Sequence, residues 1–147
     1  TNMPTTLITQ EMMENIDSVK EFPTYFQTYV NKEFELRVTI IGDQVFAARI
    51  NSQESELTKI DSRDMSAEID YSAFELPEEV KNRCLNFVKS YDLEYGAIDL
   101  IVTHSGDYVF LENNPGGQFL YIEQLIPEFK IMDCLAQKLV SEAICQQ

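Results

Sequence analysis

The sequence is poor in several residue types, and each shortage excludes a class of protein. It has 11 basic residues against 25 acidic ones, and the resulting net charge of -14 disfavours binding to nucleic acid or to an anionic membrane surface. No apolar run approaches the roughly 20 residues that cross a bilayer, and the N-terminus lacks a basic segment followed by an apolar one. These absences predict a soluble cytoplasmic protein without nucleic-acid or membrane partners.

Cysteine and linker sequences are scarce as well. The three cysteines are widely spaced and fit neither a disulfide framework nor a zinc site, which suits a reducing cytoplasm. No stretch rich in proline, glycine and serine divides the chain, and no internal repeat is present. With 44% hydrophobic residues, residues 1–147 are expected to form a single domain with a substantial core.

The most informative stretch is residues 96–118, GAIDLIVTHSGDYVFLENNPGGQ. It reads as two apolar strands, residues 96–103 and 107–113. A tight turn centred on Ser105 and Gly106 would place Asp99 opposite Glu112.

Alternation along an extended backbone would bring Asn114 to the same face as Asp99 and Glu112. Opposed carboxylates repel each other, and a hard cation with oxygen ligands would offset the repulsion. Without a cation, the carboxylates should splay toward water, be bridged by water, or share a proton at a raised pKa. We therefore predict a magnesium site for a phosphorylated ligand. The alternative from the residues alone is a solvated strand edge followed by an ordinary turn.

A second hairpin is predicted for residues 34–51. The two strands are rich in β-branched and aromatic residues, and Gly42-Asp43 between them suits a two-residue type II′ turn. This register places Arg37 on one face together with Glu35 and Thr39, and it places a set of apolar residues on the other face. Arg49 falls on the apolar face, where an edge or snorkelling role is expected.

The remaining elements complete an α+β pattern. Thr9 is expected to cap a helix from Gln10 to about Ser18, with Met12, Met13 and Ile16 as its core-facing side. The other expected elements are a strand over 26–30, an irregular excursion over 51–76, and helices over 77–91, 120–126 and 131–144. This order predicts a mainly antiparallel sheet with helices packed on one face.

Two motifs in residues 96–118 carry a resemblance to a known family. Gly96-Ala97-Ile98-Asp99, and then Phe110-Leu111-Glu112-Asn113-Asn114-Pro115 with Gly117-Gln118, resemble the C-terminal metal-binding motif of the ATP-grasp ligases. The match is greatest to the microviridin-type (graspetide) peptide ligases. The resemblance implies that Asp99, Glu112 and Asn114 bind the Mg²⁺ ions that bridge the phosphates of ATP. Asn113 stands where the family usually has an apolar residue.

The resemblance extends N-terminally. Gln27-Thr28-Tyr29-Val30 followed by Glu35-Leu36-Arg37-Val38 resembles the ATP-grasp hinge and the strand after it. It implies that the backbone around Tyr29 and Val30 binds adenine, that Glu35 meets the ribose hydroxyls, and that Arg37 reaches the phosphates or the acyl-phosphate.

A third element, Asp61-Ser62-Arg63, resembles the Asp-aromatic-Arg element of the same family, with Ser62 in place of the aromatic residue. It implies that Arg63 contacts phosphate or substrate.

What the resemblance implies about function is ligation driven by ATP. A carboxylate is activated as an acyl-phosphate, which a hydroxyl or amine then attacks. In the graspetide ligases both groups belong to one precursor peptide. Alternatives are a glutamate-ligase-type enzyme, which adds amino acids to a chain end, and a non-catalytic nucleotide-binding or interaction module.

The resemblance also implies that the chain is one part of a larger enzyme. The family's phosphate-binding lysines and flexible glycine-rich loop precede the hinge, and no residues before Gln27 match them. The chain also opens without an initiator methionine. We therefore expect an excised C-terminal portion that is inactive without the remainder of its own ATP-grasp enzyme. The oligomeric state, including a homodimer, is left open.

Overall fold

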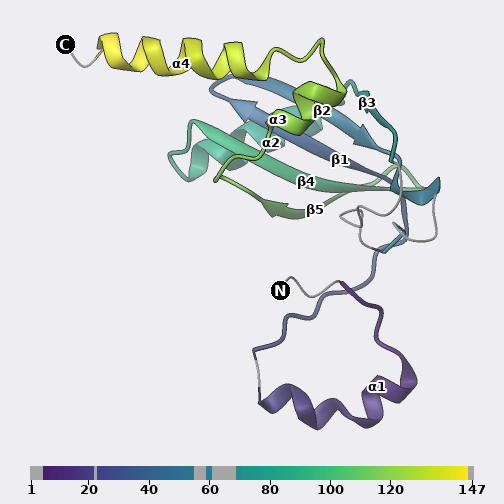
Figure 1. Ribbon diagram of the computed structural model, residues 1–147. Coiled ribbons are helices and arrows are strands. Elements are labelled where there is room, and N and C mark those ends of the chain that lie inside the picture. Colours follow the sequence, from purple (N-terminus) through teal and green to yellow (C-terminus); the bar gives the residue numbers. More distant parts are fainter. Residues whose placement is uncertain (1–4, 22, 55–58, 61–68, 146–147) are drawn as a thin grey trace.

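The computed structural model describes residues 5–21, 23–54, 59–60 and 69–145 (Figure 1). Its centre is an antiparallel sheet of five strands in the order β3-β2-β1-β4-β5. The two long strands β1 and β4 pair in the middle, so the two sequence-local hairpins lie side by side. The strands are β1 (Lys32–Ile41), β2 (Gln44–Ile50), β3 (Tyr71–Ala73), β4 (Tyr95–Thr103) and β5 (Tyr108–Asn113).

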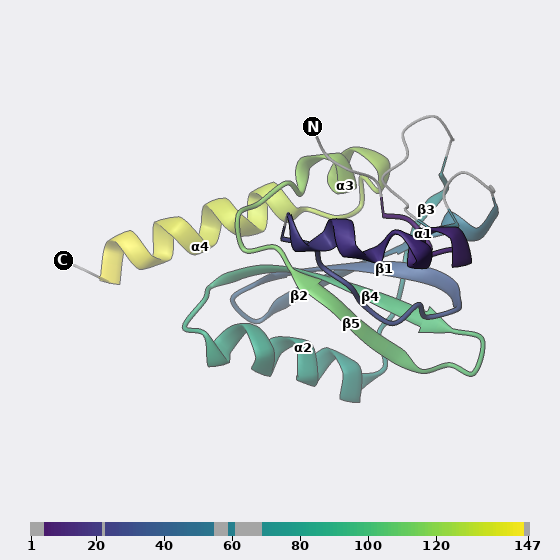
Figure 2. The same cartoon turned by 90° about the horizontal axis from the view of Figure 1, so that it is seen from below.

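Helices pack against the sheet, which confirms the expected α+β class, but they cover both faces and not one as predicted, because each face carries its own apolar cluster. Helix α2 (Glu78–Ser90) lies on one side of it, and α3 (Leu120–Leu125) with the start of α4 (Ile131–Cys145) lies on the other (Figure 2). The N-terminal segment, with α1 (Gln10–Glu14) and the 3₁₀ helix η1 (Ile16–Lys20), lies apart from the sheet in Figure 1. No helix in the described part of the chain is long and apolar enough to span a membrane.

The two faces of the sheet contact different cores. Alternate residues of the central strands, including Leu36, Val38 and Ile98, are buried against Cys84 and Val88 of α2. On the opposite face Ile41 is buried against Ile122 of α3, together with Ala48, Ile126 and Ile131. This second cluster covers only one end of its face. The same face also carries polar and charged residues, among them Arg37, Thr39 and Asp99, and these belong to the candidate site.

The first hairpin has the predicted register. Arg37 pairs with Ala48 and Ile41 pairs with Gln44, as a two-residue turn at Gly42-Asp43 requires. Gly42 has φ 56° and Asp43 does not have a positive φ, which fits a type II′ turn. A glycine suits this position because the first residue of the turn has a positive φ, which other residues rarely adopt.

The second hairpin has a different turn from the one predicted. A three-residue loop, His104 to Gly106, replaces the two-residue turn, with Gly106 at φ 84° and its N–H donating to the Thr103 carbonyl. The longer loop shifts the pairing by one residue next to the turn, where Ile101 faces Val109. An irregularity at Leu111 reverses the shift, so the predicted pairing of Asp99 with Glu112 is confirmed.

The predicted strand over residues 26–30 is wrong. Residues 23–31 have no regular secondary structure and are mostly exposed. A strand needs a partner for its backbone groups, and no described strand pairs with this segment. The sequence pattern indicates that these residues suit a strand, but it does not show whether another strand lies beside them to form hydrogen bonds.

Other boundaries differ from expectation by small amounts. The Thr9 hydroxyl caps α1 by accepting a hydrogen bond from the Met12 N–H, but the α-helix stops at Glu14 and Met12, Met13 and Ile16 are exposed rather than core-facing. The excursion over 51–76 contains the short 3₁₀ helix η2 (Ser52–Glu54) and the edge strand β3, which was missed. Pro77 is the N-cap of α2 rather than its first residue.

Gly96 marks a close approach between β4 and α2. A Cβ atom there would lie 2.6 Å from Val88 Cγ2 and 2.9 Å from Asn113 Oδ1, both in packed positions. We expect Gly96→Ala to destabilise the fold by about 1–3 kcal/mol, as overpacking does. Gly116→Ala is the matched control, because no atom lies within 4 Å of its added Cβ. Thermal denaturation of both variants tests this, and equal melting temperatures would contradict it.

Candidate functional site

Three adjacent strands bring charged residues into one row across the sheet. Arg37 on β1 pairs with Asp99 on β4, and Asp99 pairs with Glu112 on β5. Paired residues share a face, so the three side chains lie on the side of the sheet opposite α2. The sequence predicted the pair of carboxylates and the face of Arg37 separately. It did not predict that Arg37 lies beside Asp99, because that depends on which hairpin strands meet.

Asn114 joins the two carboxylates. Its Nδ2 donates hydrogen bonds to Asp99 Oδ2 at 3.0 Å and to Glu112 Oε1 at 3.1 Å. Its backbone N–H donates to the Ala97 carbonyl at 2.8 Å, which continues the ladder one residue beyond β5 and keeps the side chain on this face. Asp99, Glu112 and Asn114, called the acidic triad below, are therefore brought together as predicted.

Arg37 supplies the positive charge beside the acidic triad. Its Nε lies 3.1 Å from Asp99 Oδ1, and the two side chains are 15% and 21% exposed. The N–H is not aligned well enough for a hydrogen bond, so Nε and Nη1 are both buried without one. Burial disfavours the charged form of the guanidinium, but Asp99 and Tyr121 of α3 favour it and raise the pKa of Arg37. Arg37 is thus held in place with part of its donor capacity unused.

Burial raises the pKa of Asp99 to about 6. Repulsion from Glu112 and Glu35 adds to this effect, and Arg37 opposes it without cancelling it. A raised pKa is one of the outcomes expected for opposed carboxylates without a cation. Because the folded protein binds this proton more tightly than the unfolded chain, the group's contribution to stability is greatest at acid pH and is lost as pH rises from about 4 to 6.

This shift predicts a measurable titration. In the absence of added Mg²⁺, the carboxyl carbon of Asp99 should titrate in an NMR experiment with a midpoint of about 6 instead of 3.8. Asp99→Asn identifies the signal. Added Mg²⁺ with ATP should lower the midpoint, because a cation favours the ionised form. A midpoint at or below 4 without Mg²⁺ would contradict the electrostatic description of the site.

Several buried polar atoms around Arg37 lack hydrogen-bond partners. Apart from Asn113 Oδ1, every such side-chain atom in the described residues lies on the face of the acidic triad: Glu35 Oε2, Arg37 Nε and Nη1, Thr39 Oγ1 and the Tyr95 hydroxyl. A buried polar atom without a partner costs free energy, and native proteins have few of them. Their concentration on one face indicates a place for a polar ligand.

Other residues expected in the site lie elsewhere or are not described. Tyr29 and Val30 are in the irregular segment before β1, and the Tyr29 side chain is half exposed. Arg63 lies outside the described residues. Arg49 is on the opposite face, where its guanidinium carbon lies 3.9 Å from the centre of the Phe34 ring and its Nε donates to Asn51 Oδ1. This packing confirms the placement of Arg49 on the apolar face.

Sequence reasoning missed three contributors to this face: Lys32, Tyr95 and Tyr121. Lys32 pairs with Glu35, although residues three apart in a regular strand point to opposite faces. A strand irregularity between Lys32 and Phe34 makes the contact feasible, and nothing in the sequence marks it. Tyr95 and Tyr121 come from the start of β4 and from α3, and only the fold brings them near Arg37.

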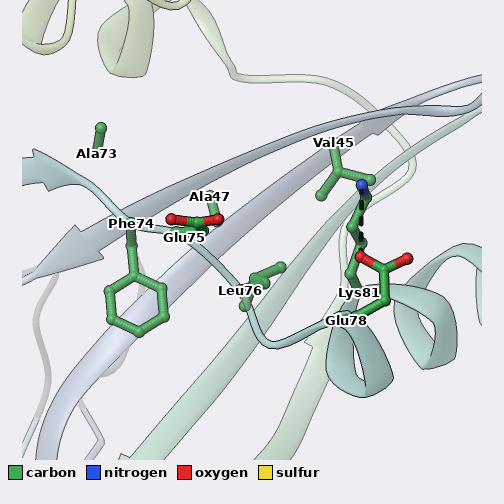
Figure 3. A pocket seen from close by; sticks show the side chains of 8 residues that line it. All are labelled: Val45, Ala47, Ala73, Phe74, Glu75, Leu76, Glu78 and Lys81. Atoms are coloured by element: carbon green, nitrogen blue, oxygen red, sulfur yellow. Dashed lines mark ion pairs between the residues drawn. The ribbon is translucent and has the colours of Figure 1, made fainter.

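A pocket of about 440 Å³ lies away from this site (Figure 3). It is lined by Val45 and Ala47 of β2, by residues 73–76, and by Glu78 and Lys81 at the start of α2. Ala47 belongs to the core beneath α2, so the pocket is on the face opposite the acidic triad. It therefore adds no residue to the candidate site.

Solved structures similar to this one include several ATP-grasp ligases. A RiPP-associated ATP-grasp ligase of Chryseobacterium gregarium, in complex with ADP and a leader and core peptide, has a TM-score of 0.84 and 31% identity, covering 93% of this chain and 42% of its own. The macrocyclase MdnC of Microcystis aeruginosa MRC, bound with precursor peptide MdnA, has a TM-score of 0.78 and 36% identity, covering 91% and 41%.

A further similar structure is the ATP-grasp ligase PsnB, complexed with a phosphomimetic variant of its minimal precursor, Mg and ADP. It has a TM-score of 0.63 and 27% identity, covering 78% of this chain and 34% of its own. No protein-family model and no curated protein matches the sequence. The chain is thus similar in fold and sequence to RiPP-associated ATP-grasp ligases, and it spans about two fifths of the length of the first two.

Proposed function

We propose that this chain, which resembles the RiPP-associated ATP-grasp ligases in fold and sequence, forms the C-terminal portion of such an enzyme and binds Mg²⁺ and ATP on the face of the acidic triad. The observation that carries the proposal is the row Arg37, Asp99 and Glu112 with Asn114, set among buried polar atoms without partners. Nucleotide and Mg²⁺ in the similar structures support it.

The residues of the acidic triad fit a magnesium ion. Mg²⁺ prefers oxygen ligands, and two carboxylates with an amide oxygen provide them. Among the described residues no three Asp, Glu, His or Cys side chains gather as ligands, so the site depends on Asn114 as its third member. Rotating the Asn114 amide by half a turn would exchange Nδ2 for Oδ1 between the carboxylates. Bound Mg²⁺ would neutralise part of the charge on the phosphates.

The reaction proposed for the whole enzyme has two steps. A carboxylate oxygen of the substrate attacks the γ-phosphorus of ATP, and ADP leaves, giving an acyl-phosphate. A hydroxyl or amine then attacks the acyl carbon, and inorganic phosphate leaves with formation of an ester or amide. Arg37, buried and with unused N–H donors, is placed to stabilise negative charge that develops on phosphate oxygens. Glu35 is proposed to accept from ribose, and the backbone near Tyr29 and Val30 to contact adenine.

The substrate proposed is a ribosomally made precursor peptide that carries both the carboxylate and the nucleophile. Peptides in the similar structures support this class. The test is to incubate the intact protein with ATP, Mg²⁺ and the precursor peptide encoded nearest to it. The peptide should lose one water per link while ADP forms. A peptide that gains an amino acid would instead indicate the glutamate-ligase type, and ATP binding without any ADP would indicate a non-catalytic module. This chain alone is expected to release no ADP.

A further inference from the structure

Among the residues that the structure describes, Lys32 is the most deeply buried charged residue outside the row of Arg37, Asp99 and Glu112. Its Nζ lies 2.7 Å from Glu35 Oε1, and the two side chains are 4% and 12% exposed. Nζ also lies 3.5 Å from the carbonyl oxygen of Ile60. Lysine is almost never fully buried unless it is paired, so this contact with Glu35 explains how the ammonium can be buried.

The geometry of β1 departs from a regular strand to make this pair. In a regular strand Lys32 and Glu35 would point to opposite faces. The pairing of β1 with β4 shifts between Lys32 and Phe34, and this irregularity allows the ammonium to meet a carboxylate three residues away. A β-bulge of this kind changes the direction in which a nearby side chain points.

The ion pair satisfies only one oxygen of the Glu35 carboxylate. Oε1 accepts from Lys32, whereas Oε2 is buried and has no hydrogen-bond partner. An ionised carboxylate offers acceptors only, so the partner that Oε2 lacks must be a donor. Glu35 alternates with Arg37 and Thr39 along β1, so it shares their face, which also carries the acidic triad.

We propose that Lys32 is a positioning residue that fixes Glu35 with Oε2 directed at a ribose hydroxyl group of the nucleotide. This inference rests on the proposed function. Lys32 holds Oε1 and compensates the charge of the carboxylate, so the carboxylate is restricted in orientation before the nucleotide arrives. A nucleotide that lacks the hydroxyl leaves Oε2 buried and unpaired, and a site built for a hydroxyl rejects such an analogue. Lys32 therefore governs discrimination between ATP and its deoxy analogues without contacting either.

The test measures dissociation constants of ATP, 2′-deoxy-ATP and 3′-deoxy-ATP, each with Mg²⁺, for the intact protein. The parent should prefer ATP over at least one analogue by roughly 10- to 100-fold. Glu35→Gln and Lys32→Met should each reduce this preference toward unity, and the double variant should reduce it no further, because both changes break one unit. Affinity for the rejected analogue should stay within about twofold of the parent.

Lys32→Met leaves a buried carboxylate without its cation and could unfold the protein. Lys32→Arg keeps the charge but changes the geometry of the contact with Oε1, so it serves as the test if Lys32→Met does not fold. The preference of the Lys32→Arg variant for ATP over the rejected analogue should also fall. A folded Lys32 variant with the parent's preference would overturn the inference, as would equal weakening of ATP and both analogues. A parent that binds no nucleotide in a Mg²⁺-dependent way would instead overturn the proposed function.

Discussion

Glu112→Gln and Asp99→Asn are each expected to abolish the thermal stabilisation that the intact protein gains from Mg²⁺ and ATP together. A ligand that binds only the folded state stabilises it by about 2.7 kcal/mol at one hundred times its dissociation constant. Each substitution replaces a carboxylate of the acidic triad by a neutral amide, which weakens the site for a hard cation. The measurement is a thermal-shift titration with Mg²⁺, ATP and both.

The gain is compared within each variant, because Asp99→Asn also removes the ionic partner of Arg37 and so changes the starting melting temperature. Glu128→Gln is the matched control, since Glu128 is exposed in the segment between α3 and α4. It should keep the full gain. The assignment of the acidic triad fails if the variants at positions 99 and 112 gain as much as the parent does from Mg²⁺ with ATP.

Arg37→Met should reduce ADP release from the intact protein by about 100- to 1000-fold at saturating ATP and precursor peptide. Removing one preorganised donor to developing negative charge has an effect of this size. Arg37→Lys should restore only part of the rate, because an ammonium cannot replace the two-pronged contact of a guanidinium with phosphate oxygens. Coupled detection of ADP under single-turnover and steady-state conditions measures the loss.

Arg49→Lys is the control for Arg37, because Arg49 lies in the neighbouring strand but on the other face of the sheet, stacked on Phe34. Its rate should stay within about threefold of the parent, since this substitution keeps the positive charge and lies on the face of the sheet away from the acidic triad. Equal losses at positions 37 and 49 would indicate a general effect on the sheet, and the role proposed for Arg37 would be rejected.

The parts of the fold that could be predicted are those set by local sequence. The pairing of β1 with β2 follows from the Gly42-Asp43 turn, because a two-residue turn fixes every pair along the hairpin. The helices near residues 78–90 and 131–145 follow from periodic apolar residues and from favourable residues at the start of the first one.

The candidate site was predicted in part. Asp99 and Glu112 do face each other, but they do so through a three-residue loop and an irregularity at Leu111 instead of the predicted two-residue turn. The extra loop residue and the irregularity offset one another. Neither has a strong sequence signal, since a glycine suits both turn lengths.

Features that depend on contacts between distant segments could not be predicted. The pattern of hydrophobic residues does not specify which hairpins pair with each other, so the contact of Arg37 with Asp99 could not be predicted from the sequence. The same limit explains the expected strand over 26–30 that has no partner, the missed edge strand β3, and the ion pair between Lys32 and Glu35.

The central claim is that Asp99, Glu112 and Asn114 hold the magnesium of an ATP-dependent ligase. The most direct measurement is a crystal structure of the intact protein grown with Mg²⁺ and a non-hydrolysable ATP analogue. The claim predicts Mg²⁺ bound by carboxylate oxygens of Asp99 and Glu112, with the Asn114 amide turned so that Oδ1 replaces Nδ2 between them. A nucleotide and metal bound away from this face, or Mg²⁺ on the phosphates without any contact to these three residues, would contradict it.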